Sequence, residues 1–156
     1  MQNFKLAALA DAYFTPLFLL GEEALQKLGA VKMTVDEYPG FPCRVSLEDA
    51  QIGEEVILLP YQHHRTNSPY QASGPIYARR GVETKQLDLN EIPKMLLHRL
   101  LSLRAYDENG MMVNASVVEG SVLKEALHKC LENLKVEYIH IHNAKQGCYN
   151  CLVVRD

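Results

Sequence analysis

The sequence predicts an α+β protein with a mainly antiparallel sheet and two or three helices, folded as a single globular domain over residues 1–156. Short runs of alternating hydrophobic and polar residues recur along the chain, as is typical of half-buried strands. These runs are interrupted by a few separated helical segments, which favours α+β over a regular βα alternation. Hydrophobic residues make up 47% and charged residues 22% of the chain, enough for a core that needs no disulfides.

The N-terminal segment predicts a strand, a helix and a second strand. Residues 4–9 are compatible with a short first strand. Leucines and alanines at helical spacing predict a helix from about Thr15 to Leu28, and Gly29 is a typical residue just beyond a helix end. Residues 31–35 alternate between hydrophobic and polar side chains, which indicates a half-buried strand.

A hairpin and a long polar loop are predicted next. Residues 43–47 alternate in polarity, and residues 56–59 are apolar on both faces, so the second strand of this hairpin should be central in its sheet. The segment from Tyr61 to Pro75 reads as a long polar loop, and long ordered loops are often functional. Residues 76–79 predict a short strand after it.

The central part of the chain predicts a helix followed by a hairpin. Asn90 can cap a helix over residues 92–101, whose leucines and isoleucine recur at helical spacing. Residues 101–106 alternate as a strand, Asp107–Gly110 is a strong hairpin turn, and residues 111–118 form the returning strand.

The C-terminal part contains the clearest helical pattern. Ser121 is placed to cap this helix. Its apolar stripe consists of Leu123, Leu127, Cys130, Leu131 and Leu134. Residues 136–142 and 148–154 then predict two final strands, while the order of strands in the sheet stays open.

Charge and composition exclude several classes of protein. The formal net charge of −3 argues against nucleic-acid binding, which normally requires a basic excess. Asp11 and Pro16 interrupt the only apolar segment near the N-terminus, so we expect neither a signal peptide nor a membrane span. The expected location is the cytoplasm, where the four cysteines would stay reduced, including the closely spaced Cys148 and Cys151.

Four stretches of the chain, taken together, carry a family resemblance. They are PGFPCRVSLEDAQIGEEVILLPYQH, SPYQASGPIYAR, LLSLRAYDENGMMVNASVVEG and YIHIHNAKQGCY. The chain resembles the family catalogued as domain of unknown function 1203, which comprises small, mostly bacterial proteins. The resemblance implies membership of that family, and it implies no catalytic residue, substrate or cofactor.

The motif His140-Ile141-His142 is the sharpest chemical feature. On a strand its two imidazoles share one face, about 6.5–7 Å apart, and neutral imidazole is a common metal ligand. His63 and His64 could complete such a site, with Cys148 or a carboxylate. A cupin-like iron or zinc site would need a glutamate shortly after the pair, and residues 143–146 contain none. The sequence therefore assigns no metal ligand and leaves the cofactor unknown.

Arg44 and Arg104 each lie on the polar face of a predicted strand. A guanidinium group in such a place either pairs with a carboxylate of the protein or binds a carboxylate or phosphate group of a ligand.

The first functional hypothesis is a site for a small anionic molecule, either catalytic or purely binding. Its expected acid–base groups are His142 and His63, since imidazole can transfer protons near neutral pH. The expected ligand-binding residues are Arg44, Arg104, Tyr61, Ser73 and His140. This hypothesis requires that two polar strand faces meet. The alternatives are a non-catalytic protein-interaction module and a metal-dependent enzyme that uses the His-x-His pair. The ligand, the reaction class and the oligomeric state stay open.

Overall fold

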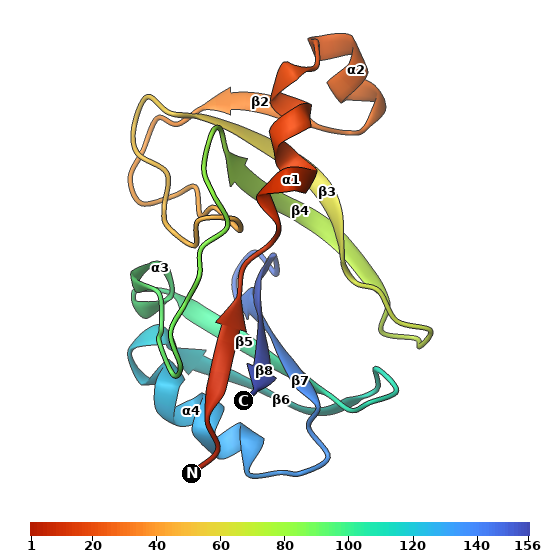
Figure 1. Ribbon diagram of the computed structural model, residues 1–156, viewed down its shortest axis with the longest axis vertical. Helices are drawn as coiled ribbons and strands as arrows, with labels where there is room; N and C mark the ends of the chain where they lie inside the picture. Colours follow the sequence, from red (N-terminus) through yellow and green to blue (C-terminus); the bar gives the residue numbers. More distant parts are fainter.

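The computed structural model covers residues 1–156 and contains two antiparallel sheets, which lie one above the other in Figure 1. The upper sheet has the strand order β2-β3-β4, and the lower sheet has the order β1-β8-β7-β5-β6. The strands are β1 (Phe4–Ala7), β2 (Val31–Thr34), β3 (Glu55–His64), β4 (Ala72–Arg79), β5 (Leu100–Tyr106), β6 (Met112–Glu119), β7 (Tyr138–Asn143) and β8 (Tyr149–Arg155). The α+β class with mainly antiparallel sheet is confirmed.

Four short α-helices accompany the sheets, where two or three were expected. They are α1 (Asp11–Phe14), α2 (Glu22–Lys27), α3 (Lys94–Leu97) and α4 (Leu123–Leu131). Two 3₁₀ turns adjoin them, at Thr15–Leu19 and Gly120–Val122. The chain passes from the lower sheet to the upper one directly after β1 and returns between β4 and α3 (Figure 1).

The larger hydrophobic core lies between α4 and the five-stranded sheet. Leu123, Leu127 and Leu131 of α4 are fully buried there, against residues such as Leu103 and Ile141 of β5 and β7. The predicted apolar stripe is correct as far as Leu131, where the helix ends. Leu134 lies beyond the helix and is 81% exposed, so its assignment to the stripe was wrong.

Replacing Leu127 by alanine is expected to lower the free energy of unfolding by about 2–5 kcal/mol, because it leaves a cavity in this core. Denaturant unfolding of the purified variant measures the loss. Leu134→Ala is the matched control and should change stability by less than about 0.5 kcal/mol, since the side chain is exposed. Equal losses in the two variants would contradict the placement of α4.

The smaller core lies between the three-stranded sheet and the N-terminal helices. β3 is the central strand of this sheet, as predicted. The continuous helix predicted from Thr15 to Leu28 is wrong, because Leu20 and Gly21 adopt extended backbone conformations that separate the 3₁₀ turn from α2. Gly29, with φ +71°, ends the helical region as expected.

The strand predicted over residues 43–47 is also wrong, because this segment forms a tight turn. The Leu47 N–H donates to the Cys43 carbonyl, and the Cys43 N–H donates to the Glu48 carbonyl, so local bonds replace a ladder. Leu47 has φ +52°, which no regular strand residue adopts. The polar member of the pattern, Arg44, is therefore not on a strand face: it is buried in the turn.

Two further elements differ from the prediction in length. β3 continues to His64 and β4 begins at Ala72, so the loop predicted from Tyr61 to Pro75 is much shorter. His63 and His64 of this segment lie on a paired strand and face the second sheet, whereas Gln62 and Ser73 are exposed. The helix predicted after Asn90 reduces to α3, and Asn90 itself, at φ +58°, accepts a hydrogen bond from the Phe4 N–H instead of capping a helix.

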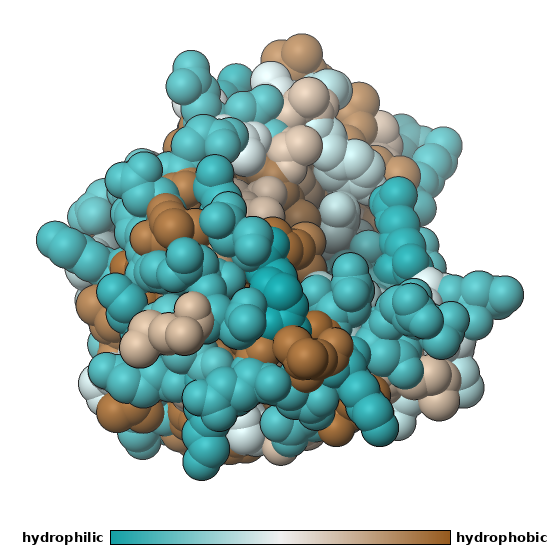
Figure 2. Space-filling model, turned by 60° about the horizontal axis from the view of Figure 1, so that its bottom comes forward, coloured by the Kyte–Doolittle hydropathy of each residue, from teal (hydrophilic) through white to brown (hydrophobic).

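The surface seen in Figure 2 is mostly hydrophilic, with hydrophobic residues scattered among charged and polar ones. No helix is long and apolar enough to cross a membrane. All four cysteines are free thiols, which agrees with the expectation that Cys148 and Cys151 do not pair.

Candidate functional site

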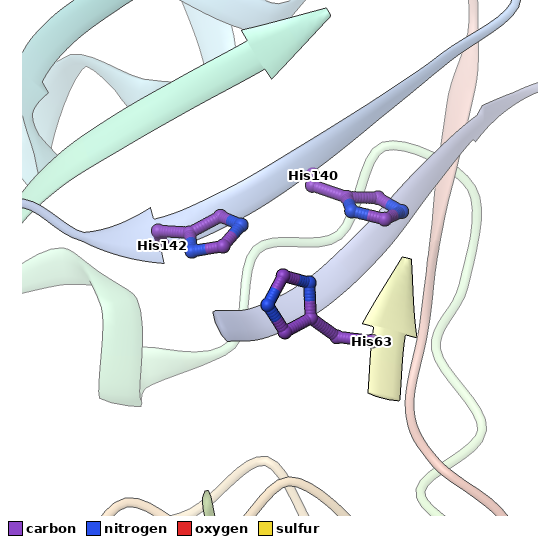
Figure 3. A group of neighbouring side chains, drawn as sticks. All are labelled: His63, His140 and His142. Carbon is purple, nitrogen blue, oxygen red and sulfur yellow. The ribbon is translucent and has the colours of Figure 1, made fainter. Parts of the chain in front are cut away.

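Three histidines meet where the polar faces of the two sheets oppose each other. β7 carries His140 and His142 on the face turned away from the larger core, and β3 carries His63 opposite them (Figure 3). The ring centroid of His63 lies 5.0 Å from that of His142 and 6.1 Å from that of His140. The two polar strand faces therefore meet, which the first hypothesis required.

A local irregularity of β3 brings two consecutive histidines to this interface. The pairing of β3 with β4 shifts register between Tyr61 and His64, as in a β-bulge. On a regular strand His63 and His64 would point to opposite faces. Here both rings approach β7, and His64 lies 4.8 Å from His140 between centroids.

The three rings lie close together, and each has a ring nitrogen without a hydrogen-bond partner. One ring nitrogen each from His63, His140 and His142 can be chosen so that all three lie within 4.8 Å of one another. Nδ1 of His63, Nδ1 of His140 and Nε2 of His142 are buried and have no hydrogen-bond partner. Buried polar atoms without a partner are uncommon in folded proteins, and such a group calls for an explanation.

The tautomer of His142 follows from its one hydrogen bond. Nδ1 lies 2.9 Å from the carbonyl oxygen of Gly147, and a carbonyl can only accept. The proton is therefore on Nδ1, and the lone pair is on the unpartnered Nε2. A backbone carbonyl that fixes the ring in this way is typical of the surroundings of metal-ligating histidines.

His64 differs from the other three rings because both of its nitrogens are used. Nδ1 lies 2.7 Å from the Tyr70 carbonyl oxygen and must donate to it. Nε2 then accepts from the Tyr138 hydroxyl at 2.5 Å. His64 thus has a structural role and no lone pair to offer, and the cluster able to bind a ligand consists of His63, His140 and His142, hereafter the histidine triad.

Burial keeps the histidine triad neutral at physiological pH. It lowers the pKa of His140 to about 3 and the pKa values of His63 and His142 to about 4. Proximity of the positive Arg104 also lowers the pKa of each ring. Neutral imidazole is the form that binds a metal ion.

We expect the stability of the metal-free protein to fall as pH is lowered from about 6.5 to about 4. In this window the unfolded chain binds a proton at His142 and the folded chain does not, so acid favours unfolding. The fully buried His142 alone should contribute a loss of about 2 kcal/mol between about pH 7 and about pH 5. Urea unfolding with a chelator present measures it. A His142→Gln variant with an undiminished pH slope would contradict the assignment.

Tyr149 is a member of this site that the sequence analysis missed. Its ring stacks on His63 at 5.2 Å, with planes 5° apart, and also lies 5.1 Å from His140. Burial raises the pKa of Tyr149 well above its usual value, so the phenol stays protonated. The sequence could have indicated this, because the last two predicted strands form a hairpin. In that hairpin β8 pairs with β7, and Tyr149 lies opposite His142.

Arg104 joins the site from β5. It pairs with His140 across the β5–β7 ladder, and directly opposed residues share a face of the sheet. Its Nε donates to the Ser102 hydroxyl at 3.3 Å, and no carboxylate lies within ion-pair distance of it. The half-buried guanidinium group therefore gives the surroundings of the triad an uncompensated positive charge.

The other predicted site residues are distributed around the triad rather than gathered in it. Tyr61 packs on Tyr13 and Phe14 and lines a cleft of about 650 Å³ that opens onto His63 and His140. Ser73 is exposed and lines a different hollow. Arg44 is not a member of the triad, and its Nε donates to the Tyr149 carbonyl at 2.7 Å.

Comparison with known proteins identifies a family and no closer relative. The profile of a family described as "Protein of unknown function (DUF1203)" matches residues 40–155, well over half of the chain. This range contains the whole histidine triad. Searches among curated proteins and among solved structures find no match.

Proposed function

The chain belongs to the family described as protein of unknown function DUF1203, and from this premise we propose that its histidine triad binds one divalent transition-metal ion, with coordination positions left open for water and a small anionic molecule. On this proposal the protein depends on a metal ion for its function, and that function is enzymatic.

One observation carries the proposal: three imidazole rings from two sheets bring one nitrogen each within 4.8 Å of one another, and each ring has a buried nitrogen without a hydrogen-bond partner. At a tetrahedral zinc ion with nitrogen ligands at about 2.0–2.1 Å, such atoms lie about 3.3 Å apart. Metal binding would therefore draw the most distant pair closer. His63 is the least buried of the three, so its side chain has the most room to move.

Three histidine ligands favour a catalytic metal site over a structural one. Structural zinc sites use four protein ligands, whereas catalytic sites use three and keep a position open. Three neutral imidazoles leave the full charge of the ion to lower the pKa of a bound water molecule or to polarise a substrate oxygen. A cleft lined by Tyr61, His63 and His140 borders two of the three rings.

Arg104 supports the anionic character of the ligand. Its guanidinium group has no carboxylate partner and lies on the same sheet face as His140 and His142. A second positive charge beside a metal ion would orient a carboxylate or phosphate group bound to the open position. This combines the anion-binding hypothesis with the metal-dependent alternative drawn from the sequence.

Elemental analysis of protein purified without a histidine tag tests the proposal. We expect about one zinc, iron, copper or nickel ion per chain, or uptake of one Zn²⁺ per chain after treatment with a chelator. Binding of the ion should also raise the melting temperature, because the unfolded chain lacks the site. Protein that neither contains nor takes up a stoichiometric ion would overturn it.

A further inference from the structure

We propose that a second site, the cleft bordered by Arg44, binds a carboxylate or phosphate group of a small molecule. This cleft has a volume of about 860 Å³ and is bounded by the turn that contains Arg44, by β4 and by the β7–β8 hairpin. It is lined by a different set of residues from the cleft that opens onto the histidine triad.

Arg44 is a buried charge without a counter-charge. The residue is 1% exposed, and none of the ion pairs of the protein involves it. Its Nε donates to the Tyr149 carbonyl and its Nη1 to the Pro42 carbonyl. Burial lowers the pKa of Arg44 to about 10, so the guanidinium remains charged at neutral pH. A buried charge is costly unless it is paired, and two carbonyl groups do not neutralise it.

The remaining donors of Arg44 are available to a ligand. A guanidinium group has five N–H donors in a planar fork, and the two bonds to carbonyls leave three. These bonds also hold the fork in one orientation, so little side-chain entropy remains to be lost on binding. Arg44 borders the cleft, and a planar fork is the group that best matches the geometry of a carboxylate or phosphate.

The other charged groups of the cleft fit an anion held at its floor. Lys145 of the β7–β8 hairpin lies exposed at the rim. Glu37 and Glu119 also border the cleft, but both are exposed to water, where their charge is screened. Arg99 is already neutralised by Asp49, whose two carboxylate oxygens accept from its guanidinium. The buried Arg44 is therefore the group that an anion would neutralise.

The β7–β8 hairpin connects the two sites. Cys148 and Lys145 of this hairpin border the cleft, while the carbonyl of Gly147 fixes the ring of His142. The same hairpin is followed by Tyr149, whose carbonyl accepts from Arg44 and whose ring stacks on His63. An anion at Arg44 would thus lie in a cleft bordered by the hairpin that also orients His142.

Inorganic phosphate and succinate are the probes, and the Nε–H resonance of Arg44 in a ¹⁵N NMR titration is the readout. Titrating the chelator-treated His63→Gln, His140→Gln, His142→Gln triple variant separates this proposal from the metal site, since that variant lacks the triad. We expect a saturable shift of the Arg44 resonance with at least one probe. Saturable binding of phosphate only would identify a phosphate ligand, and saturable binding of succinate only would identify a carboxylate ligand.

Two substitutions complete the test. Binding to the variants is followed through the backbone N–H resonance of Cys148, which borders the cleft and is present in both of them. Arg44→Met should abolish saturable binding, and the surface variant Lys145→Met, which is not expected to affect folding, should weaken it at least about threefold. Lys124→Met, an exposed lysine on α4, is the matched control and should leave binding unchanged. The proposal is overturned if neither probe gives saturation, or if binding is as tight in Arg44→Met and Lys145→Met as in the parent.

Discussion

Replacing His142 by glutamine is expected to weaken Zn²⁺ binding at least about 100-fold. Even the loss of a group that only orients a ligand costs about 10–100-fold in metal affinity, and the loss of a ligand costs more. Glutamine keeps a similar length and polarity but has no imidazole lone pair. A competition titration against a chromophoric chelator at neutral pH measures the dissociation constant. His63→Gln and His140→Gln should show losses of the same order.

Two other histidines provide matched controls for this result. His128→Gln changes a ring on α4 that hydrogen-bonds to the Gln2 carbonyl, and it should leave zinc affinity unchanged. His64→Gln removes the imidazole nearest to the triad, whose nitrogens are both hydrogen-bonded. It should lower stability and change zinc affinity by less than about tenfold. A loss in His64→Gln that matches the loss in His142→Gln would contradict the three-ligand assignment.

Replacing Gly120 by alanine is expected to lower the free energy of unfolding by about 3 kcal/mol or more. An added Cβ would lie 1.8 Å from the carbonyl oxygen of Leu96 and 2.8 Å from the carbonyl carbon of Leu97. Both are backbone atoms, which cannot rotate away as a side chain could. The Gly120 N–H donates to the Arg99 carbonyl at 2.8 Å, so the two segments would have to separate and that bond would be lost.

Gly21→Ala is the control for this substitution. A Cβ added at Gly21 would have no neighbouring atom within 4 Å, and the residue has an ordinary φ of −75°. Its replacement should change stability by less than about 1 kcal/mol. Thermal and denaturant unfolding of both variants provide the comparison. Similar stability of the two variants would mean that the close contact between Gly120 and α3 is absent.

The elements that sequence patterns predicted well are those whose pattern reflects one buried face. The hydrophobic stripe through Leu127 and the alternation in β5 and β7 arise because each element packs one face on the same core. The spacing of the hydrophobic residues therefore distinguishes helix from strand. Residues 43–47 show the limit of this reasoning. Every residue in that turn is buried on all sides, so alternation of hydrophobic and polar residues there did not report a strand. Arg44 was consequently assigned to the wrong kind of element.

The candidate site was predictable only in part. Strand parity placed His140 and His142 on one face, and His63 was named as a possible partner on chemical grounds. Three facts were beyond sequence reasoning: that the two sheets oppose their polar faces, that β3 is irregular near His63, and that Tyr149 stacks there. Spacing within one strand could not identify His63 as the third imidazole of the cluster, because β3 and β7 belong to different sheets.

Anomalous diffraction at the zinc absorption edge, from crystals grown with Zn²⁺, would show whether the histidine triad binds the ion. We expect one strong peak about 2.0–2.1 Å from a ring nitrogen of each member of the histidine triad, with Nε2 as the ligand atom of His142. If the three rings keep the arrangement described above and no peak lies among His63, His140 and His142 at saturating zinc, metal binding by the triad is contradicted.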